Sequence, residues 1–381
     1  MDIAYGLSSE MTTYARGFSF LLQKCVYHEL AERIVKIGLG GALLPPAEIL
    51  SAWNITQTVK PAADAGLIND TFVVGSPPSG ILQRVNPIFG PDIHLDIEAI
   101  TNHLENKGIP TPRLVRTTSG DLCVPATDGA WRLLTFIPGT TVHTIASTDQ
   151  AASAASLVGA FHRATSDLNH NFHFLRPGAH DTKAHMALLH TTLKDCEAHP
   201  LAERARTIGG EVLERWECWS GEINLPTRIC HGDLKISNIR FDEDHKTARC
   251  LLDLDTLAPQ TIAVEMGDAW RSWCNPAGED KPNEAHFDLE IFEASARAWL
   301  DAGPDLTPVE KDNLVPGIER ICLELAARFC ADAIRQVYFK EDQSRHPVPG
   351  THNLSRAFGQ LNLARSVRDL SSAAQAIIHS R

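Results

Sequence analysis

The sequence lacks an apolar run long enough to cross a membrane, and it lacks an excess of positive charge. Its N-terminal apolar stretch, residues 17–22, ends at Gln23 and Lys24, whereas a transmembrane helix needs about 20 apolar residues. Lys and Arg number 35 against 47 Asp and Glu, which gives a net charge of −12. We therefore expect no membrane span and no nucleic-acid partner, because general nucleic-acid binding depends on clustered positive charge. A small anionic ligand held by a few local cations is compatible with this balance.

Common metal-binding and redox motifs are also missing. The 9 cysteines form no C-x-x-C pair, and no H-E-x-x-H occurs among the 17 histidines. This pattern gives no support to zinc hydrolase chemistry, and it favours free thiols in a reducing compartment. We therefore expect a cytoplasmic protein.

The length and composition fit a globular protein of two domains or two lobes. Hydrophobic residues make up 43% and charged residues 22% of the 381 residues, and roughly 100–200 residues per domain allows for two. Residues 1–44 are expected to form a helical extension. Apolar residues recur at helical spacing over 18–37, and the glycines at 38–41 end that helix.

The rest of the chain changes character near residue 137. Short strands are expected over 55–59, 71–74, 81–85, 114–115, 122–124 and 131–137, and the apolar spacing over 91–107 predicts one helix. Helices are then expected over 149–168, 184–193, 202–219, 287–300, 315–337 and 352–370, with one β-like island at 229–255. The predicted fold class is α+β, with a small antiparallel sheet lobe carrying one helix (45–137) and a larger, mainly helical lobe (138–381).

The β-like island carries the strongest chemical signal. Asp233 is followed five positions later by Asn238, and Asp253 comes after a predicted hairpin over 239–252. Phosphoryl transfer to a hydroxyl needs a group that orients the hydroxyl and accepts its proton, together with ligands for Mg²⁺ against the phosphates. A protein-kinase catalytic loop and the Asp that follows it have this order and spacing. Asp233 can therefore act as the base, Asn238 and Asp253 can hold Mg²⁺, and Lys235 either approaches the γ-phosphate or lies exposed.

A nucleotide site of this kind also needs a cation on the third strand and a helix carboxylate that positions it. Arg84 and Glu98 stand at suitable places. Gln83 is adjacent to Arg84, and because neighbouring residues on a strand face opposite ways, only one of the two can point inward. Phe136 and Ile137, where the sheet lobe ends, are expected to contact the nucleotide. No Walker A sequence occurs, which excludes the P-loop kinases.

With these residues the sequence resembles the aminoglycoside phosphotransferase and choline kinase superfamily, which shares the bilobal protein-kinase-like fold. Other segments are similar, more narrowly, to N-acetylhexosamine 1-kinases. The matching segments are 67–74, 81–89, 129–132, 252–259, 267–271 and 352–354, together with Glu324, Arg328, Phe329, Asp332, Tyr338 and Phe339. The resemblance runs from about residue 48 to about residue 370 and leaves out the N-terminal extension.

This resemblance implies a kinase that uses ATP and Mg²⁺ to phosphorylate the anomeric C1 hydroxyl of an N-acetylhexosamine or related sugar, giving a sugar 1-phosphate. The implied roles are Asp233 as base, Asn238 and Asp253 as magnesium ligands, Asp255 as support for a second metal, and Arg328, Tyr338 and Leu67 as sugar contacts. Asp268 would brace the catalytic loop. A monomer or a homodimer is expected, with the sugar and ATP as partners.

Two departures from the family pattern concern the sugar. Leu67 stands where the family often has a His, and Ala179 replaces an aromatic residue. Two other functions therefore stay open, a kinase of another small alcohol (aminoglycoside, choline or homoserine type) and a kinase-like binding protein. An aminoglycoside site should be strongly acidic, which does not suit Arg328. The intact Asp233, Asn238 and Asp253 do not suit a protein that only binds.

Overall fold

The computed structural model describes residues 44–62, 68–176, 178–279 and 281–380. The predicted N-terminal extension, apart from Leu44, and the predicted sugar contact Leu67 lie outside the described residues. Among the helices that are described, none combines the length and the apolarity needed to pass through a bilayer.

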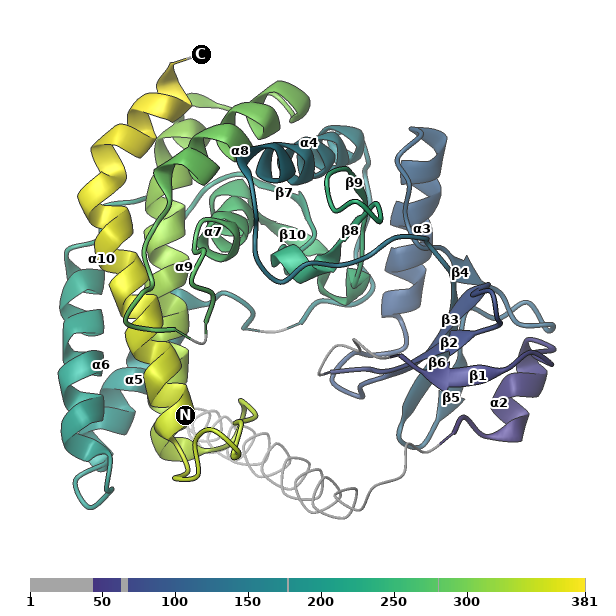
Figure 1. Cartoon of the computed structure of the whole chain (residues 1–381), viewed down its shortest axis with the longest axis horizontal. Helices are drawn as coiled ribbons and strands as arrows, with labels where there is room; N and C mark the ends of the chain where they lie inside the picture. The colour runs from purple at the N-terminus through teal and green to yellow at the C-terminus, as the bar shows by residue number, and fades with distance from the viewer. Residues whose placement is uncertain (1–43, 63–67, 177, 280, 381) are drawn as a thin grey trace, which may run out of the picture. The chain divides into compact units, whose positions relative to one another are not determined.

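An antiparallel sheet of six strands forms the first part of the described chain (Figure 1). The strands are β1 (Val59–Pro61), β2 (Asp70–Val74), β3 (Gly80–Val85), β4 (Leu114–Val115), β5 (Val124–Ala126) and β6 (Gly129–Thr135), and two helices, α2 (Ala47–Ala52) and α3 (Ile93–Asn106), accompany them. The order is β1-β2-β3-β6-β4, with β5 paired to β6. We call this part the sheet lobe. The predicted sheet and α3 are confirmed, but the prediction missed α2 and placed the first strand four residues too early.

The two faces of this sheet differ because side chains alternate along each strand. One face carries Phe72, Leu82 and Trp131, which pack together with Ile49 of α2. The other face carries Gln83 of β3 and its cross-strand partner Arg132 of β6. Arg132 is only 2% exposed. The sheet therefore buries a cation on the face opposite its apolar cluster.

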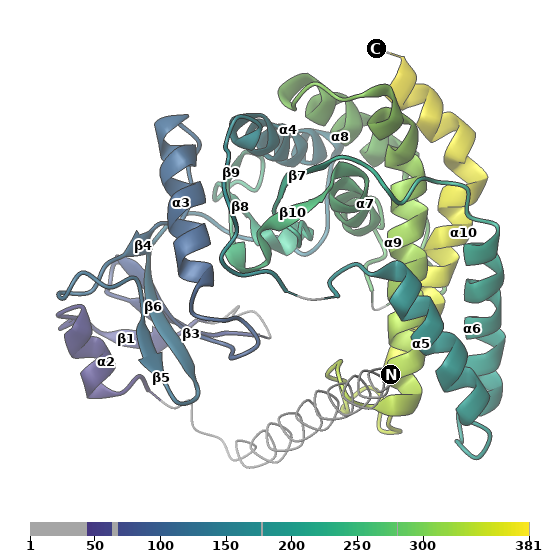
Figure 2. The same cartoon turned by 180° about the vertical axis from the view of Figure 1, so that it is seen from behind.

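The remaining helices and short strands form the helical lobe (Figures 1 and 2). The helices are α4 (Thr148–Thr165), α5 (Thr182–Asp195), α6 (Ala202–Glu217), α7 (Ile262–Trp273), α8 (Leu289–Ala302), α9 (Pro308–Arg335) and α10 (Thr351–His379). The strands are β7 (Thr227–Cys230), β8 (Ile239–Phe241), β9 (Ala248–Leu251) and β10 (Ala258–Thr261), paired as β7 with β10 and β8 with β9. The predicted hairpin over 239–252 is confirmed. The lobe boundary near residue 137 stays a prediction.

The core of the helical lobe is built around α7 and α9. Helix α9 packs along α10 and against α5, α6 and α7 (Figure 2). Where α7 and α9 meet, a Cβ on Gly317 would lie 2.1 Å from the carbonyl oxygen of Ala263, so the two backbones can approach only because this residue is glycine. Trp270 and Trp299 are fully buried and meet edge to face. The apolar side of α3, from Ile93 to Leu104, belongs to this same core, which fixes the sheet lobe to the helical lobe.

Glu265 of α7 holds the loop 231–238 that carries Asp233. Its Oε1 accepts the backbone N–H of His231 at 2.7 Å and its Oε2 accepts that of Gly232 at 2.9 Å. His162 Nε2 lies 3.1 Å from Oε1, while His162 Nδ1 accepts the indole N–H of Trp299 at 3.1 Å. The Nε2 of His162 therefore carries the proton and donates to Glu265. Burial opposes the negative charge, but these hydrogen bonds outweigh it and lower the pKa of Glu265.

Further contacts fix the same loop along its length. Gly232 has φ +81°, and a Cβ there would lie 2.3 Å from the carbonyl oxygen of Thr256, so glycine is required. Trp273 Nε1 donates to the carbonyl oxygen of Leu234 at 2.8 Å. The backbone N–H of Leu252 donates to the carbonyl oxygen of Asn238 at 2.8 Å. The loop is thus held rigidly by α7 and by the hairpin that follows it.

Replacing Glu265 by Gln should destabilise the protein, because an amide offers one acceptor oxygen for the two backbone N–H groups that Glu265 now binds. One unpaired buried donor costs about 1–3 kcal/mol, so the urea midpoint should fall while the slope of the transition stays unchanged. The matched control is Glu284→Gln, since the side chain of Glu284 is 65% exposed, and it should change stability by less than about 0.5 kcal/mol. Equal midpoints for the two variants would contradict this account of the loop.

Candidate active site

Asp233, Lys235 and Asn238 meet on the 231–238 loop. Asn238 Nδ2 donates to the carbonyl oxygen of Asp233 at 2.9 Å and to its Oδ2 at 3.0 Å. Lys235 Nζ donates to the same Oδ2 at 2.6 Å. Both of these hydrogen bonds of Asn238 use the amide nitrogen, which leaves its oxygen to face a cation. The structure thus brings the predicted base, one predicted metal ligand and the loop lysine together.

Asp253, the second predicted metal ligand, lies on a left-handed turn directly after β9. Its φ of 60° and ψ of 62° are uncommon outside glycine. The turn is tied to the 231–238 loop by His231, whose Nε2 lies 2.7 Å from the carbonyl oxygen of Leu252. The carboxylate reaches solvent but is crowded by protein. This desolvation, followed by the charges of Asp255 and Asp233, raises the pKa of Asp253 to about 7.

These oxygen donors fit a divalent cation. Carboxylate and amide oxygens are the ligands that Mg²⁺ and Ca²⁺ take in proteins. A cation beside Asp253 would also remove the repulsion between the neighbouring carboxylates, and its binding would release the proton that the raised pKa retains. The chemistry of these donors suits a divalent cation, and the metal site stays a prediction.

Asp255, expected as support for a second metal, has a different environment. It is 2% exposed, its Oδ1 pairs with Arg132, and its Oδ2 accepts from Asn69 Nδ2 at 2.7 Å and from Arg132 at 3.0 Å. Burial raises and the Arg132 pair lowers the pKa of Asp255, and the net direction is downward. With both oxygens engaged by the sheet lobe, Asp255 joins the two lobes, and the predicted metal role is not supported by this geometry.

The predicted pairing of Arg84 with Glu98 is not formed. Arg84 donates to Asp70 at 2.8 Å and also pairs with Asp128, while Glu98 binds Arg116 at 2.6 Å. Arg84 shares the sheet face of Leu82, so it points away from Arg132. The prediction chose the wrong member of the Gln83–Arg84 pair. Gln83 is the residue that faces the buried cation, and its Oε1 accepts from Arg132 at 2.8 and 3.0 Å.

Phe136 and Ile137, the other predicted nucleotide contacts, follow β6. Arg240 of β8 donates to the carbonyl oxygen of Ile137 at 3.1 Å, and its guanidinium carbon lies 5.7 Å from the centroid of the Phe136 ring. Ile137 also lines a hollow of about 410 Å³ together with Pro138 and Gly139. These contacts join the segment after β6 to β8, and the contact of the two residues with a nucleotide stays a prediction.

A second polar cluster is built on α9 and on the segment before α5. Glu324 is fully buried, and its carboxylate accepts from Thr182 Oγ1 at 2.5 Å and lies 3.0 Å from His180 Nδ1. Arg320 Nε donates to Thr182 at 2.9 Å. Burial opposes both charges, but their mutual hydrogen bond raises the pKa of His180 and lowers the pKa of Glu324 to about 2. The contact between His180 and Glu324 therefore favours the charged form of each group.

Asp268 of α7 lies between this cluster and the 231–238 loop and acts on both through its charge. Its charge lies close enough to Lys235 and to His180 to raise the pKa of each. Its hydrogen bonds go to Arg271, at 2.9 and 3.2 Å from Oδ1. That Asp268 braces the loop stays a prediction, since its hydrogen bonds go to Arg271 and its effect on the loop is through the charge of Lys235. Glu265, one turn earlier on the same helix, makes the bonds to the loop backbone.

Arg328 and Tyr338, the predicted sugar contacts, lie together beside Glu324. The guanidinium of Arg328 is 3.9 Å from Glu324 and lies over the rings of Tyr338 and Phe339, at 5.6 and 5.4 Å from their centroids. The Tyr338 hydroxyl also accepts a hydrogen bond from Arg176. Asp332 fixes this segment by accepting the backbone N–H groups of residues 337–339 at 2.8–3.0 Å. The structure thus brings Arg328 and Tyr338 into one cluster of cations and aromatic rings.

Three residues of the site were missed from the sequence, namely Arg132, Glu265 and His180. Arg132 could have been considered from the sequence. Alternation left Gln83 as one of two residues able to point inward, and Arg132 is the cross-strand partner of Gln83. Glu265 and His180 act on partners 33 and 144 residues away. No local pattern indicates such partners.

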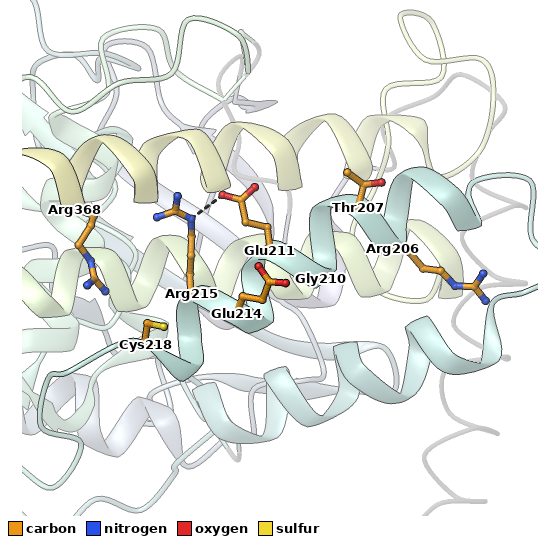
Figure 3. Close-up of a pocket in the computed structure, with 8 residues that line it drawn as sticks. All are labelled: Arg206, Thr207, Gly210, Glu211, Glu214, Arg215, Cys218 and Arg368. Carbon is orange, nitrogen blue, oxygen red and sulfur yellow. Dashed lines mark hydrogen bonds and ion pairs between the residues drawn. The ribbon is translucent and has the colours of Figure 1, made fainter.

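A larger surface hollow lies elsewhere and does not contain these residues (Figure 3). It has a volume of about 590 Å³, and its lining comes from α6, Cys218 and Arg368 of α10. Most of its charged side chains, Glu214 excepted, are engaged with one another or with neighbours. Glu211 binds both Arg215 and Arg365, and Arg368 binds Glu319. The hollow shows no group aimed at a ligand, and it plays no part in the site.

The stability that the His180–Glu324 pair gives to the fold should decrease at both low and high pH. Because folding lowers the pKa of Glu324, its carboxylate gives its full stabilisation above the ordinary pKa of 4.5. This stabilisation is lost as the pH falls toward about 2. Because folding raises the pKa of His180, its imidazolium gives its full stabilisation below the ordinary pKa of 6.5. This stabilisation is lost as the pH rises through the pKa of the folded state. The difference in unfolding free energy between wild type and Glu324→Gln should therefore be largest between pH 4.5 and 6.5. A difference that does not change with pH would contradict a charged pair.

Comparison with known proteins agrees with this geometry. Residues 58–305 match a family model described as the phosphotransferase enzyme family, APH. Among solved structures, the chain is similar to an aminoglycoside phosphotransferase from Alicyclobacillus acidocaldarius subsp. acidocaldarius, with 15% identity and a TM-score of 0.58 over 88% of this chain and 99% of that one.

Two further solved structures give the same picture. A microcompartment-associated aminopropanol kinase has 16% identity and a TM-score of 0.55, over 87% of this chain and 98% of that one. An amicoumacin kinase in complex with AMP-PNP and Ca²⁺ has 12% identity and a TM-score of 0.54, over 89% of this chain and 95% of that one. At these identities the similarity shows the fold, and the predicted protein-kinase-like α+β class is confirmed. Because the matched family region spans well over half of the sequence and includes both the 231–238 loop and the Asp253 turn, the chain belongs to the phosphotransferase enzyme family.

Proposed function

We propose that this protein is a kinase that transfers the γ-phosphoryl group of ATP to the anomeric C1 hydroxyl of an N-acetylhexosamine or a related sugar. The observation that carries the proposal is the arrangement of Asp233, Asn238 and Asp253 beside an acceptor side that is cationic and aromatic. The cytoplasmic location and the state of monomer or homodimer stay predictions.

The chemistry follows from the loop geometry. Asn238 Oδ1 and the Asp253 carboxylate would hold Mg²⁺, which when bound neutralises charge on the phosphates during transfer. Asp233 orients the acceptor hydroxyl and accepts its proton as the oxygen attacks the γ-phosphorus. Its neighbours Lys235 and Asn238, at 2.6 and 3.0 Å, keep the carboxylate oriented. A single carboxylate base suits an anomeric hydroxyl, because that hydroxyl is more acidic than an ordinary alcohol.

We call the cluster of Arg176, Arg328, Tyr338 and Phe339 the acceptor side. Its charge favours a neutral or anionic substrate over an amine. Arg176 and Arg328 bring positive charge to the Tyr338 segment, since both guanidinium groups lie over the Tyr338 ring, at 6.0 and 5.6 Å from its centroid. Aromatic rings and guanidinium groups are suited to packing on a sugar ring and to donating to hydroxyl and acyl oxygens. Leu67, which lies outside the described residues, stays a predicted sugar contact.

A kinase of an amino alcohol is the second candidate, since one similar solved structure is an aminopropanol kinase. Its substrate amine would need a free carboxylate. The acidic groups on this side are already engaged. Glu324 pairs with His180 at 3.0 Å, Asp332 accepts the backbone N–H groups of residues 337–339, and Asp268 and Glu279 pair with Arg271 at 2.9 and 3.2 Å. Glu279 also lies 3.3 Å from Arg356. This prior pairing makes the amine a weaker candidate than the acylated sugar.

Asp233→Asn should fold normally and lose most of the phosphoryl transfer. A positioned acid–base group contributes about 10²–10⁴-fold to the rate, and the partly exposed carboxylate of Asp233 adds little to the core. The measurement is ADP release with acceptor present, beside a thermal unfolding curve that serves as the folding control. Activity within a few-fold of wild type would show that Asp233 is not the base.

An acceptor panel tests the substrate assignment. ADP release should be fastest with N-acetylhexosamines, slower with the corresponding amino sugars, and slowest with amino alcohols. Arg328→Gln should raise the KM of the favoured sugar by about tenfold or more, since a hydrogen bond from a charged group contributes about 1.5–3 kcal/mol. The KM of ATP should stay unchanged.

The control for Arg328 is Arg335→Gln on the same helix, because Arg335 is exposed at the end of α9, and this change should leave both KM values as they are. Faster turnover of amino alcohols than of every sugar would overturn the sugar assignment and leave the kinase assignment intact. Failure of every acceptor, with ATP still bound, would favour the kinase-like binding protein.

A further inference from the structure

Asp96 of α3 and two histidines of the segment after α4 form a separate cluster. Asp96 is 1% exposed. Its Oδ1 lies 2.7 Å from His170 Nε2 and 3.0 Å from His173 Nδ1. Three potential ligand atoms, one from each residue, lie within 4.8 Å of one another. None of them takes part in the site described above.

The spacing of these atoms is close to that of ligands around one small cation. Zinc binds imidazole nitrogen at about 2.0–2.1 Å and carboxylate oxygen at about 2.0–2.2 Å. Neighbouring ligands on a tetrahedral ion are therefore separated by roughly 3.3 Å. The two nitrogen–oxygen separations, 2.7 and 3.0 Å, need to open by roughly 0.3–0.6 Å to reach this spacing, and the two nitrogens lie within 4.8 Å of each other. Two imidazoles and one carboxylate form a donor set that zinc accepts.

The carboxylate is already fixed and charged as a metal ligand must be. Its Oδ1 accepts the backbone N–H of His173 at 2.9 Å and its Oδ2 accepts that of Phe174 at 3.0 Å. Burial opposes the charge, but the hydrogen bonds from His173, His170 and Phe174 lower the pKa of Asp96. Backbone bonds of this kind orient a ligand and are common around metal sites.

The cluster is also open on one side. The side chain of His173 is 50% exposed and that of His170 is 10% exposed. An ion can therefore enter from solvent, and a water molecule can complete the coordination. A second cluster, His162, Cys230 and Glu265, is buried throughout, and it is already used to hold the 231–238 loop, so it offers no such access.

We propose that Asp96, His170 and His173 bind a Zn²⁺ ion that joins α3 of the sheet lobe to the segment after α4. Binding replaces the two imidazole–carboxylate hydrogen bonds by metal bonds and releases any proton shared between these groups. Because the ligands come from two segments that meet only in the folded chain, zinc should stabilise the native state. The site is independent of the proposed sugar kinase activity.

The test uses full-length protein without an affinity tag, treated with EDTA and then dialysed. Zn²⁺ is titrated by calorimetry in the presence of excess Mg²⁺, which occupies carboxylate sites such as Asp253 but competes poorly for imidazole. Thermal unfolding with and without Zn²⁺ is measured in parallel. The variants are His170→Gln with His173→Gln, and the matched control His190→Gln, since His190 lies exposed on α5.

Wild type and His190→Gln should bind one Zn²⁺ per chain and unfold at a higher temperature in its presence. The double variant should bind at least about tenfold more weakly and lose the thermal shift. Co²⁺ in place of Zn²⁺ should give the visible absorption of a tetrahedral site in wild type and not in the double variant. Absence of stoichiometric binding to wild type, or equal binding by the double variant, would overturn the proposal and leave the cluster as a hydrogen-bonded contact.

Discussion

The buried ion pair between Arg132 and Asp255 is the interaction on which the arrangement of the site depends. It joins the sheet lobe to the turn that carries Asp253, and Gln83 and Asn69 complete its hydrogen bonds. Burying two such charges costs several kcal/mol each, which only close pairing and full hydrogen bonding can offset. The ion pair therefore adds little net stability, and its main effect is to position the Asp253 turn against the sheet lobe. This ion pair holds the Asp253 turn, and the Glu265 bonds hold the 231–238 loop.

The sequence predicted those elements whose pattern is local. Strands β2 and β3 and helices α3 and α8 lie within two residues of their predicted bounds, because alternation and 3.6-residue spacing are written in each segment. Helix α9 was predicted to begin at Val315, but it begins at Pro308. Thr307 and Glu310 form a capping box there, and Pro316 is accommodated inside the helix. Helix α7, in which nearly every residue is buried, was not predicted.

Among the candidate site residues, those set by a local pattern could be predicted from the sequence, and those set by tertiary packing could not. Asp233, Asn238 and Asp253 were found because a loop and a hairpin place them at fixed spacing along 21 residues of chain. Arg84 was chosen as the inward cation of the sheet, but the buried cation is Arg132, on the opposite face. Asp268 was chosen to brace the loop, but the bonds to the loop backbone come from Glu265, a turn earlier on α7. Those choices depend on which side of an element faces the loop, and only tertiary packing decides that. The same limit applies to His180, whose charge depends on Glu324 of a distant helix.

The central claim is that Asp253 and Asn238, held in place by this network, form the metal and nucleotide site. Calorimetry of Mg²⁺ with AMP-PNP near pH 7, in buffers of different ionisation enthalpy, tests it most directly. Burial and the neighbouring carboxylates raise the pKa of Asp253, so wild type should release protons when the metal complex binds at that pH. Asp253→Asn should bind the metal complex more weakly and release none. Proton release that persists unchanged in Asp253→Asn, with wild-type affinity, would place the metal elsewhere and contradict the account.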